Sequence, residues 1–280
     1  MQTAFIGLGS MGAPQAQHVA RAGFELAVFD AAAPALESFR GMARLARSAA
    51  DAARGAEIAC VCVRDDQQLE TAVFGPAGIA EGLARGALLL VHSTVRIDSL
   101  KSLESRLAPR GIALVDAPVT RTRPTNDDPF VLTMLGGEPA QRKRALAVVK
   151  SFSTEVEEVG PLGSAMALKI SNNLVTWVHI VVGTLASEIS SRHGVPSEKL
   201  VGVMQANGNL TPPVGGLLDG FRRSPPGTDP ERDAFLESQT GIGEKDLLLA
   251  IECGAAVGLD MSMVEQARKQ IRPAMVPPRR

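Results

Sequence analysis

The chain has little aromatic surface and almost no net charge. Aromatic residues make up 4% of its 280 residues, tyrosine is absent and there is one tryptophan. The 29 lysines and arginines nearly balance the 30 acidic residues, which leaves a formal net charge of −1. Proteins that bind nucleic acid use basic faces and stacking aromatic rings, and neither is indicated here. We therefore expect no nucleic-acid partner.

Cysteine and long apolar runs are also scarce. Three cysteines, an odd number, fit free thiols in a cytoplasmic protein. Cys60 and Cys62 share one face of a strand-like run, and no second pair exists elsewhere, so we expect core residues and no metal site. No run reaches the roughly 18 apolar residues of a membrane span. The first strand begins at once and leaves no room for a signal peptide. These features predict a cytoplasmic protein without a membrane partner.

What is abundant is apolar sequence in short, regularly spaced runs. Hydrophobic residues are 45% of the chain, and residues 1 to about 160 alternate apolar runs with helical stretches. This β-α alternation predicts a Rossmann-type α/β domain with a mainly parallel sheet, in which the last two strands can run antiparallel at one edge. The expected strands are 2–7, 24–30, 56–63, 86–91, 111–116, 130–135 and 153–159. The expected helices are 11–22, 34–40, 66–73, 77–83, 98–108 and 138–150.

The composition and the apolar pattern of the sequence change after Gly163. Residues 164–193 contain no proline and one glycine, and their apolar residues recur at helical spacing, which predicts one long helix. Because this helix is strongly apolar, we expect it to be the core of a second, all-helical domain. The predicted domains are therefore 1–162 and 163–280. Further helices are expected near 197–206, 213–220, 231–237, 243–258 and 260–271.

The first strand runs into a glycine-rich segment, Gly7-Leu8-Gly9-Ser10-Met11-Gly12. Glycines at this spacing between a strand and a helix allow a tight turn, close approach of a pyrophosphate, and close helix packing. The second strand ends in Asp30, where an acid accepts hydrogen bonds from ribose hydroxyls and repels a 2′-phosphate. The segment predicts NAD binding, with NADP disfavoured. A purely structural glycine turn is the alternative, and Asp30 argues against it.

Three polar groups are expected near the cofactor, since ligands of open α/β sheets bind at the carboxyl ends of the strands. His92-Ser93-Thr94 follows the fourth strand, and its hydroxyls either touch the nicotinamide side of the cofactor or cap the next helix. A loop after the fifth strand carries Thr120, Arg121, Thr122 and Arg123. Two guanidiniums suit an anionic substrate, and a solvated surface loop is the alternative.

The third group lies on the long helix. Lys169 and Asn173 are four residues apart and share a face, and Asn172 precedes the second of them. A lysine in an apolar helix is costly unless it faces a cavity or a partner. Burial favours the neutral amine, which can exchange a proton with an alcohol or a carbonyl. A lysine that extends its amine to solvent is the alternative.

Four ordered motifs resemble the β-hydroxyacid dehydrogenase family, which includes 3-hydroxyisobutyrate dehydrogenase and 6-phosphogluconate dehydrogenase. F-I-G-L-G-x-M-G-x-P matches residues 5–14, and D-x-P-V-[ST] matches 116–120. G-x-x-x-K-x-x-N-N is similar to 165–173, with Ala165 in place of glycine, and K-D-L-x-L-A matches 245–250. The resemblance covers nearly the whole chain. The C-terminus is shorter than is usual in the family.

The resemblance implies a role for each matched position. Lys169 would be the catalytic acid/base, Asn173 would orient it or the substrate, and Thr120 would bind the substrate's acid group. The residues implied at the dinucleotide are Thr94, Lys245, Val63 and Arg64. Family members usually form homodimers or homotetramers through the helical domain. The family's usual Gly-Gly after Thr120 is replaced by Arg121-Thr122, which is similar to sulfolactaldehyde reductases.

These features together predict an NAD-dependent oxidoreductase that transfers hydride to or from a small anionic 3-hydroxyacid. Two alternatives stay open. An imine reductase-like protein would use NADPH, but such enzymes generally lack the lysine, and Asp30 opposes NADPH. A non-catalytic dinucleotide-binding protein would be expected to lose Lys169 or to gain a basic extension.

Overall fold

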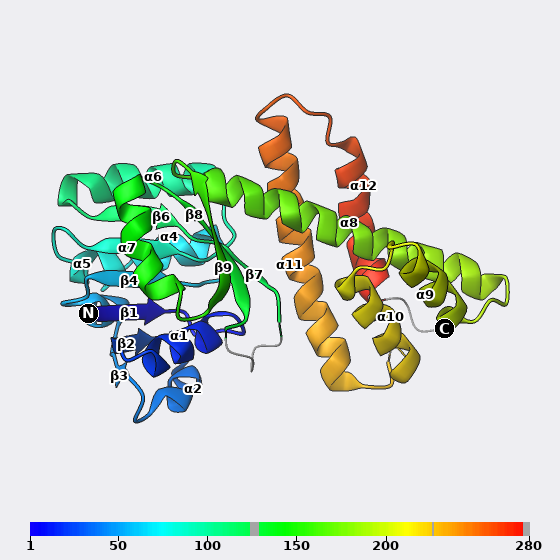
Figure 1. Ribbon diagram of the computed structural model, residues 1–280, viewed down its shortest axis with the longest axis horizontal. Helices are drawn as coiled ribbons and strands as arrows, with labels where there is room; N and C mark the ends of the chain where they lie inside the picture. Colours follow the sequence, from blue (N-terminus) through cyan, green and yellow to red (C-terminus); the bar gives the residue numbers. More distant parts are fainter. Residues whose placement is uncertain (124–128, 226, 277–280) are drawn as a thin grey trace. The chain divides into compact units, whose positions relative to one another are not determined.

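The protein is described here by a computed structural model that covers residues 1–123, 129–225 and 227–276 (Figure 1). The chain divides into two compact units, Met1–Lys169 and Ile170–Arg280. This division falls inside a helix, somewhat later than the boundary at residue 162 that the sequence suggests. The helix begins against the sheet of the first unit, so its first residues belong there by their contacts.

The first unit is built on one mainly parallel sheet, as predicted. Its described strands follow the order β3-β2-β1-β4-β5-β6-β8-β7, and β9 pairs with β8. Neighbours from β3 to β6 are parallel, β8 is antiparallel to β6 and β7, and β9 is parallel to β8. The strands are β1 Gln2–Ile6, β2 Glu25–Phe29, β3 Arg44–Leu45, β4 Ile58–Val61, β5 Leu88–Val91, β6 Ala113–Asp116, β7 Val119–Arg121, β8 Val131–Gly136 and β9 Ser153–Gly160.

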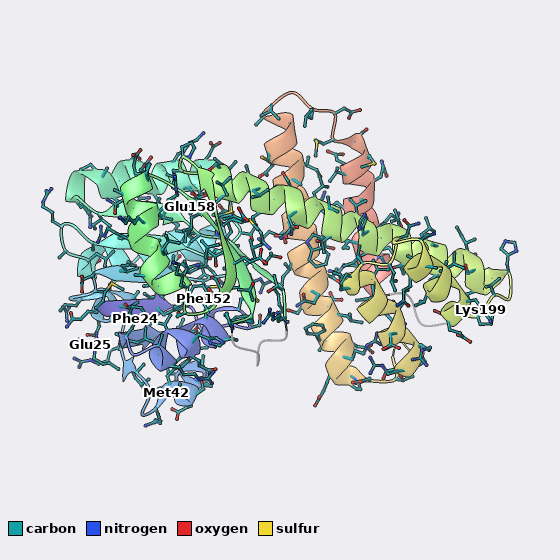
Figure 2. All side chains as sticks on the ribbon, in the orientation of Figure 1. Phe24, Glu25, Met42, Phe152, Glu158 and Lys199 are labelled. Atoms are coloured by element: carbon teal, nitrogen blue, oxygen red, sulfur yellow. The ribbon has the colours of Figure 1, made fainter. Side chains whose placement is uncertain are left out.

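Helices cover both faces of this sheet, which explains why the central strands are continuously apolar. All four residues of β4 and of β5 are buried, as expected for strands packed on both sides. On one face, α1 and α7 (Figure 1) contribute Val19 and Val148 to a core that contains Phe5 and Phe152. Phe152 is labelled in Figure 2. The described helices are α1 Gly12–Arg21, α2 Ala33–Leu36, η1 Glu37–Phe39, α3 Ala49–Ala53, α4 Asp66–Phe74, α5 Ile79–Gly82, α6 Ile97–Leu107, η2 Ala108–Arg110 and α7 Pro139–Val149.

Three short elements of this unit were not predicted. They are β3, α3 and β7, of two, five and three residues. Elements this short carry too little periodicity to be read from a sequence. The strand β7 corrects the prediction most directly, because it puts Thr120 and Arg121 on a strand paired with Leu132 and Val131 of β8, whereas the sequence suggested a loop.

The second unit is helical, as predicted, and contains α8 Ser164–Arg192 from its second turn onward, α9 Ser197–Ala206, α10 Pro212–Arg223, α11 Pro230–Ala255 and α12 Ser262–Met275. The two helices expected around 231–258 are one continuous helix, α11. Gly243 within this helix serves close packing: a Cβ there would lie 3.0 Å from Cε3 of Trp177 and 3.0 Å from Cγ1 of Ile271. Glycine in a helix is thus a packing device here rather than a terminator.

His92 belongs to the core of the first unit. Its ring stacks on Phe5 at 5.8 Å and meets Phe152 edge-on at 5.6 Å. Nδ1 lies 2.8 Å from the Ala117 carbonyl oxygen, so it carries the proton, while Nε2 has no partner. Burial among these groups lowers the pKa of His92 to about 4 from 6.5. The imidazole is therefore neutral and structural at pH 7.

This buried histidine predicts a loss of stability in acid. The unfolded chain takes up a proton near the ordinary pKa of 6.5, and the folded chain does so only near 4. The contribution is complete above pH 6.5 and is lost as the pH falls toward 4, at about 3 kcal/mol in total. Urea titrations at several pH values in this range should show that the free energy of unfolding depends less on pH in His92→Phe than in the wild type. An unchanged pH dependence would contradict the assignment, and His193→Gln, at an exposed position, is the control.

Candidate functional site

The glycine loop between β1 and α1 is shaped to accept a ligand. Gly7 has φ +91°, and a Cβ on it would lie 2.2 Å from the Cys62 carbonyl oxygen. A Cβ on Gly12 would lie 2.0 Å from the Gly7 carbonyl oxygen. A Cβ on Gly9, in contrast, would meet nothing within 4 Å. Gly7 and Gly12 thus close the turn onto its neighbours, and Gly9 faces open space.

The start of α1 adds the electrostatic part of this site. Its first turn has no acidic residue, and its N-cap Met11 makes no side-chain capping hydrogen bond. The N–H groups of the turn and the helix dipole therefore favour an anion beside Gly9. The exposed backbone at Gly9 and Ser10 gives a pyrophosphate access to them. The residues present fit the phosphates of a dinucleotide.

Asp30 lies at the end of β2, and its carboxylate is bound to the backbone on both sides. Oδ2 accepts the N–H of Leu8 at 2.6 Å, and Oδ1 accepts the N–H of Ala32 at 2.8 Å. A carboxylate oxygen has two lone pairs, so each can accept a further hydrogen bond from a ribose hydroxyl. The acid thus holds the glycine loop in addition to the role that the sequence suggests.

Ser93 joins the turns that follow β4 and β5. Its Oγ accepts the N–H of Val63 at 2.7 Å, and Val63 in turn borders Gly7. The helix α6 begins later, with Arg96 as its N-cap and no side-chain cap, so the suggestion that Ser93 or Thr94 caps it is wrong. Arg64 is exposed, and its N–H donates to Oε1 of Gln68 at 3.0 Å. Val63 thus stands beside the glycine loop, and contact of Val63 and Arg64 with the dinucleotide stays a prediction.

The side chain of Arg121, at the end of β7, contacts the glycine loop. Its Nη2 donates to Sδ of Met11 at 3.4 Å, and the side chain is otherwise exposed. Thr120 precedes it on the strand and is partly buried. Thr122 is engaged by the sheet, because its Oγ1 lies 3.2 Å from the Phe130 carbonyl oxygen and 3.1 Å from Oγ1 of Thr154. Thr122 thus supports the strand pairing rather than projecting as a free hydroxyl.

Arg123 follows at the end of the described part of this segment and is exposed. The rest of the sequence-predicted loop, residues 124–128, lies outside the described residues.

Asp116, at the end of β6, holds the first turn of α8. It is fully buried. Oδ1 accepts the N–H of Gly163 at 3.0 Å, and Oδ2 accepts the N–H of Met166 at 2.8 Å. Burial raises the pKa of Asp116, and backbone N–H donors oppose that shift. Lys169, one turn further along α8, is buried as well, with 8% of its surface exposed, as a lysine with a functional partner requires.

The second unit gathers polar side chains around Asp246, which is 2% exposed. Its Oδ2 accepts Nδ2 of Asn173 at 2.7 Å and Nε1 of Trp177 at 3.1 Å. Nζ of Lys245 lies 2.9 Å from its Oδ1. The amide of Asn173 is thereby fixed, and its oxygen, which accepts Nδ2 of Asn172 only at 3.4 Å, is free to accept a stronger bond.

Sequence reasoning missed both of these acids. Asp116 and Asp246 each lie inside a motif that had been noted for its neighbours, Thr120 and Lys245. The signal that could have identified them is an acidic residue at a position where the chain is otherwise apolar. Such a residue must be buried with partners. No group of three or more potential metal ligands occurs among the described residues.

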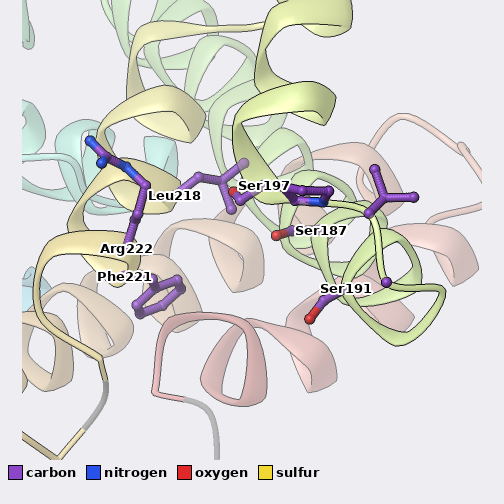
Figure 3. A pocket seen from close by; sticks show the side chains of 9 residues that line it. Ser187, Ser191, Ser197, Leu218, Phe221 and Arg222 are labelled. Atoms are coloured by element: carbon purple, nitrogen blue, oxygen red, sulfur yellow. The ribbon is translucent and has the colours of Figure 1, made fainter.

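A separate cavity of about 430 Å³ lies within the helical unit. Figure 3 shows Ser187 and Ser191 of α8 on one side and Phe221 and Arg222 of α10 on the other. None of the residues predicted for the dinucleotide or the substrate lines it. It is therefore not the predicted active site.

Comparison with known proteins agrees with this geometry. A family model for the NAD binding domain of 6-phosphogluconate dehydrogenase matches residues 2–160. An NAD-dependent L-serine dehydrogenase of Pseudomonas aeruginosa is 28% identical, over 91% of this chain and 86% of its own. A 3-sulfolactaldehyde reductase of Escherichia coli is 29% identical, over 72% of this chain and 68% of its own.

Solved structures show the same fold. A 3-hydroxyisobutyrate dehydrogenase of Mycobacterium tuberculosis, solved with L-serine, has a TM-score of 0.75 at 23% identity and covers 96% of this chain and 92% of its own. Imine reductases also share the fold.

Proposed function

Because this chain belongs to the β-hydroxyacid dehydrogenase family, we propose that it transfers hydride reversibly between NAD and a small hydroxyacid with an anionic group. The observation that carries this proposal is the buried Lys169 in a unit whose glycine loop fits the phosphates of NAD. The chain is an oxidoreductase acting on a CH–OH group, and its cofactor is NAD. Asp30, which would repel the 2′-phosphate of NADP, supports that choice.

The residues of the chain would supply binding and proton transfer. Bound NAD provides the hydride acceptor. Neutral Lys169 takes the proton of the substrate hydroxyl on oxidation, and its ammonium returns a proton on reduction. The Asn173 amide is held by Asp246, and in this proposal its oxygen accepts a hydrogen bond from the amine or the hydroxyl. Thr120 and Arg121 hold the acid group.

The test is the formation of NADH in the presence of L-serine, 3-hydroxyisobutyrate or 2,3-dihydroxypropane-1-sulfonate, the alcohol that corresponds to 3-sulfolactaldehyde. The first two carry a carboxylate as their anionic group, and the third carries a sulfonate. We expect oxidation of at least one of them with NAD and weaker activity with NADP. If none is oxidised while a cyclic imine is reduced with NADPH, the imine reductase alternative is correct. Binding of NADH without turnover of any compound would favour a non-catalytic protein.

Arg121 provides the prediction about the substrate. An exposed guanidinium beside the glycine loop suits a bidentate pair with a carboxylate or sulfonate. Loss of a hydrogen bond to a charged group costs about 1.5–3 kcal/mol, so Arg121→Ala should raise KM by about 10- to 100-fold with little change in kcat. Steady-state kinetics would measure this, with Arg47→Ala, at another exposed arginine, as control. An unchanged KM for every substrate would remove Arg121 from the site.

We also propose a homodimer, supported by an apolar stripe on α8 in the second unit. Val175, Val182, Leu185 and Ile189 are each 51–59% exposed and follow the heptad spacing of helices that pair. Among the described residues, α8 is also the one helix long and apolar enough to cross a membrane, and 22% of its most apolar window is buried. Core helices of proteins without a membrane span meet the same criterion. A stripe on one face favours a second copy of this chain over lipid.

The molar mass from light scattering tests the dimer. Leu185→Glu should shift the protein to a monomer, because two copies would bury opposed carboxylates. Val203→Glu, at an exposed apolar residue of α9, should leave the mass unchanged. A monomeric wild type would contradict the proposal.

The three cysteines are all free, which supports a cytoplasmic location, and cell fractionation would test that.

A further inference from the structure

The first turn of α8 has no capping side chain of its own. The residue before the helix is Gly163, at φ +89°, and the hydroxyl of Ser164 donates to the Pro161 carbonyl oxygen at 2.6 Å. The orphan N–H groups of a helix start need acceptors, especially when buried. Here they are supplied from the distant end of β6 by both carboxylate oxygens of Asp116. The first turn of the long helix is therefore anchored to the end of β6 by this acid.

The surroundings hold this acid in place. Gly136 of β8 pairs with Asp116 across the sheet, and a Cβ on Gly136 would lie 2.3 Å from Oδ1 of Asp116. The sequence thus keeps a glycine where any side chain would displace the carboxylate. A charge is also favoured at this position, because a helix N-terminus attracts an anion.

Lys169 lies three residues beyond Met166, one helical turn from the N–H that Asp116 accepts. Its position follows that of the first turn, since a helix moves as a rigid element. Resting on the function proposed above, we infer that Asp116 is a positioning residue, which sets the place of the Lys169 amine by fixing the start of α8. The acid of the D-x-P-V-[ST] motif would then serve the proton-transfer lysine rather than contact the substrate.

Two variants test this in different ways. Asp116→Asn keeps the shape of the side chain but replaces one of the two carboxylate oxygens with an NH₂ group, which would face a backbone N–H donor. Gly136→Ala keeps the carboxylate and displaces it. We expect each to lower kcat by about 10- to 100-fold, as misplacement of a catalytic group by about 1 Å does, with the dissociation constant of NADH retained. Ser48→Ala, which removes the cap of α3, is the control for a lost cap at a helix without site residues.

Two measurements do not depend on turnover and so separate this inference from the proposed function. Amide hydrogen exchange at residues 163–166 should accelerate in both variants and not in Ser48→Ala. Acetylation of Lys169, relative to the exposed Lys199, should become several-fold faster, because the buried amine is released. If the protein oxidises no substrate, the proposed function is refuted, but hydrogen exchange and acetylation still test whether Asp116 positions Lys169.

The inference is overturned in two ways. If exchange accelerates while kcat and Lys169 acetylation stay at the wild-type level, Asp116 is a stabilising cap and nothing more. If exchange at residues 163–166 is itself unchanged in Gly136→Ala and Asp116→Asn, the carboxylate does not anchor the helix.

Discussion

Replacing Lys169 with alanine should lower turnover by about 10²- to 10⁴-fold, the range expected for loss of an acid/base group, while NADH still binds. The lysine lies in the second turn of α8 and is 8% exposed, so its amine is not placed there for solubility. The dinucleotide loop lies on other elements and does not need it. Turnover and NADH fluorescence titrations would measure the two effects separately.

A second substitution distinguishes proton transfer from charge. Lys169→Arg keeps a cation of similar length but cannot release a proton near neutral pH, so it should be as inactive as the alanine variant. Lys199→Ala, at an exposed lysine of α9, should be fully active. Near-wild-type turnover of Lys169→Arg would show that the residue acts only through its charge, and the proton path would have to be sought elsewhere.

Much of the fold follows from local sequence. The apolar runs ending at Ile6, Phe29 and Val91 are strands because they are short, buried and bounded by turns, and the glycines at 7 and 12 fix the first turn. The long helix is equally evident from its uninterrupted apolar pattern. What sequence could not supply depends on partners far along the chain. The strand β7 exists because Val119 and Arg121 pair with β8, and the position of Gly243 within α11 is explained only by the Trp177 ring against it.

The candidate site likewise contains residues that the sequence predicts and residues that only the folded chain reveals. Residue type and spacing led to the glycine loop, Asp30, Lys169 and Asn173, because each has a chemical reason to be where it is. The supporting acids Asp116 and Asp246 were missed, since their role is to hold backbone and side chains that become neighbours only in the folded chain. Thr122 shows the opposite error, a hydroxyl that looks available in sequence and is used by the sheet.

The glycine loop gives the other large expected effect, and its three glycines should not behave alike. Gly12→Ala would place a methyl 2.0 Å from the Gly7 carbonyl oxygen and 3.2 Å from the Phe5 ring. The start of α1 must then move away from β1, which costs packing and removes the N–H groups from the phosphate position. We expect a lower melting temperature together with at least a roughly 100-fold loss of NADH affinity, equivalent to about 3 kcal/mol.

Gly9→Ala should separate those two effects. Its methyl meets no protein atom within 4 Å, and φ at Gly9 is not positive, so the melting temperature should stay close to wild type. The methyl nevertheless enters the open space that a pyrophosphate would occupy, so NADH affinity should fall steeply. Thermal melts and NADH titrations of the two variants are the measurements. Gly202→Ala, at a helical glycine of α9 with equally open surroundings, should preserve affinity and slightly raise stability. If Gly9→Ala binds NADH like the wild type, the phosphates do not approach the chain at Gly9, and the site must lie elsewhere on the sheet.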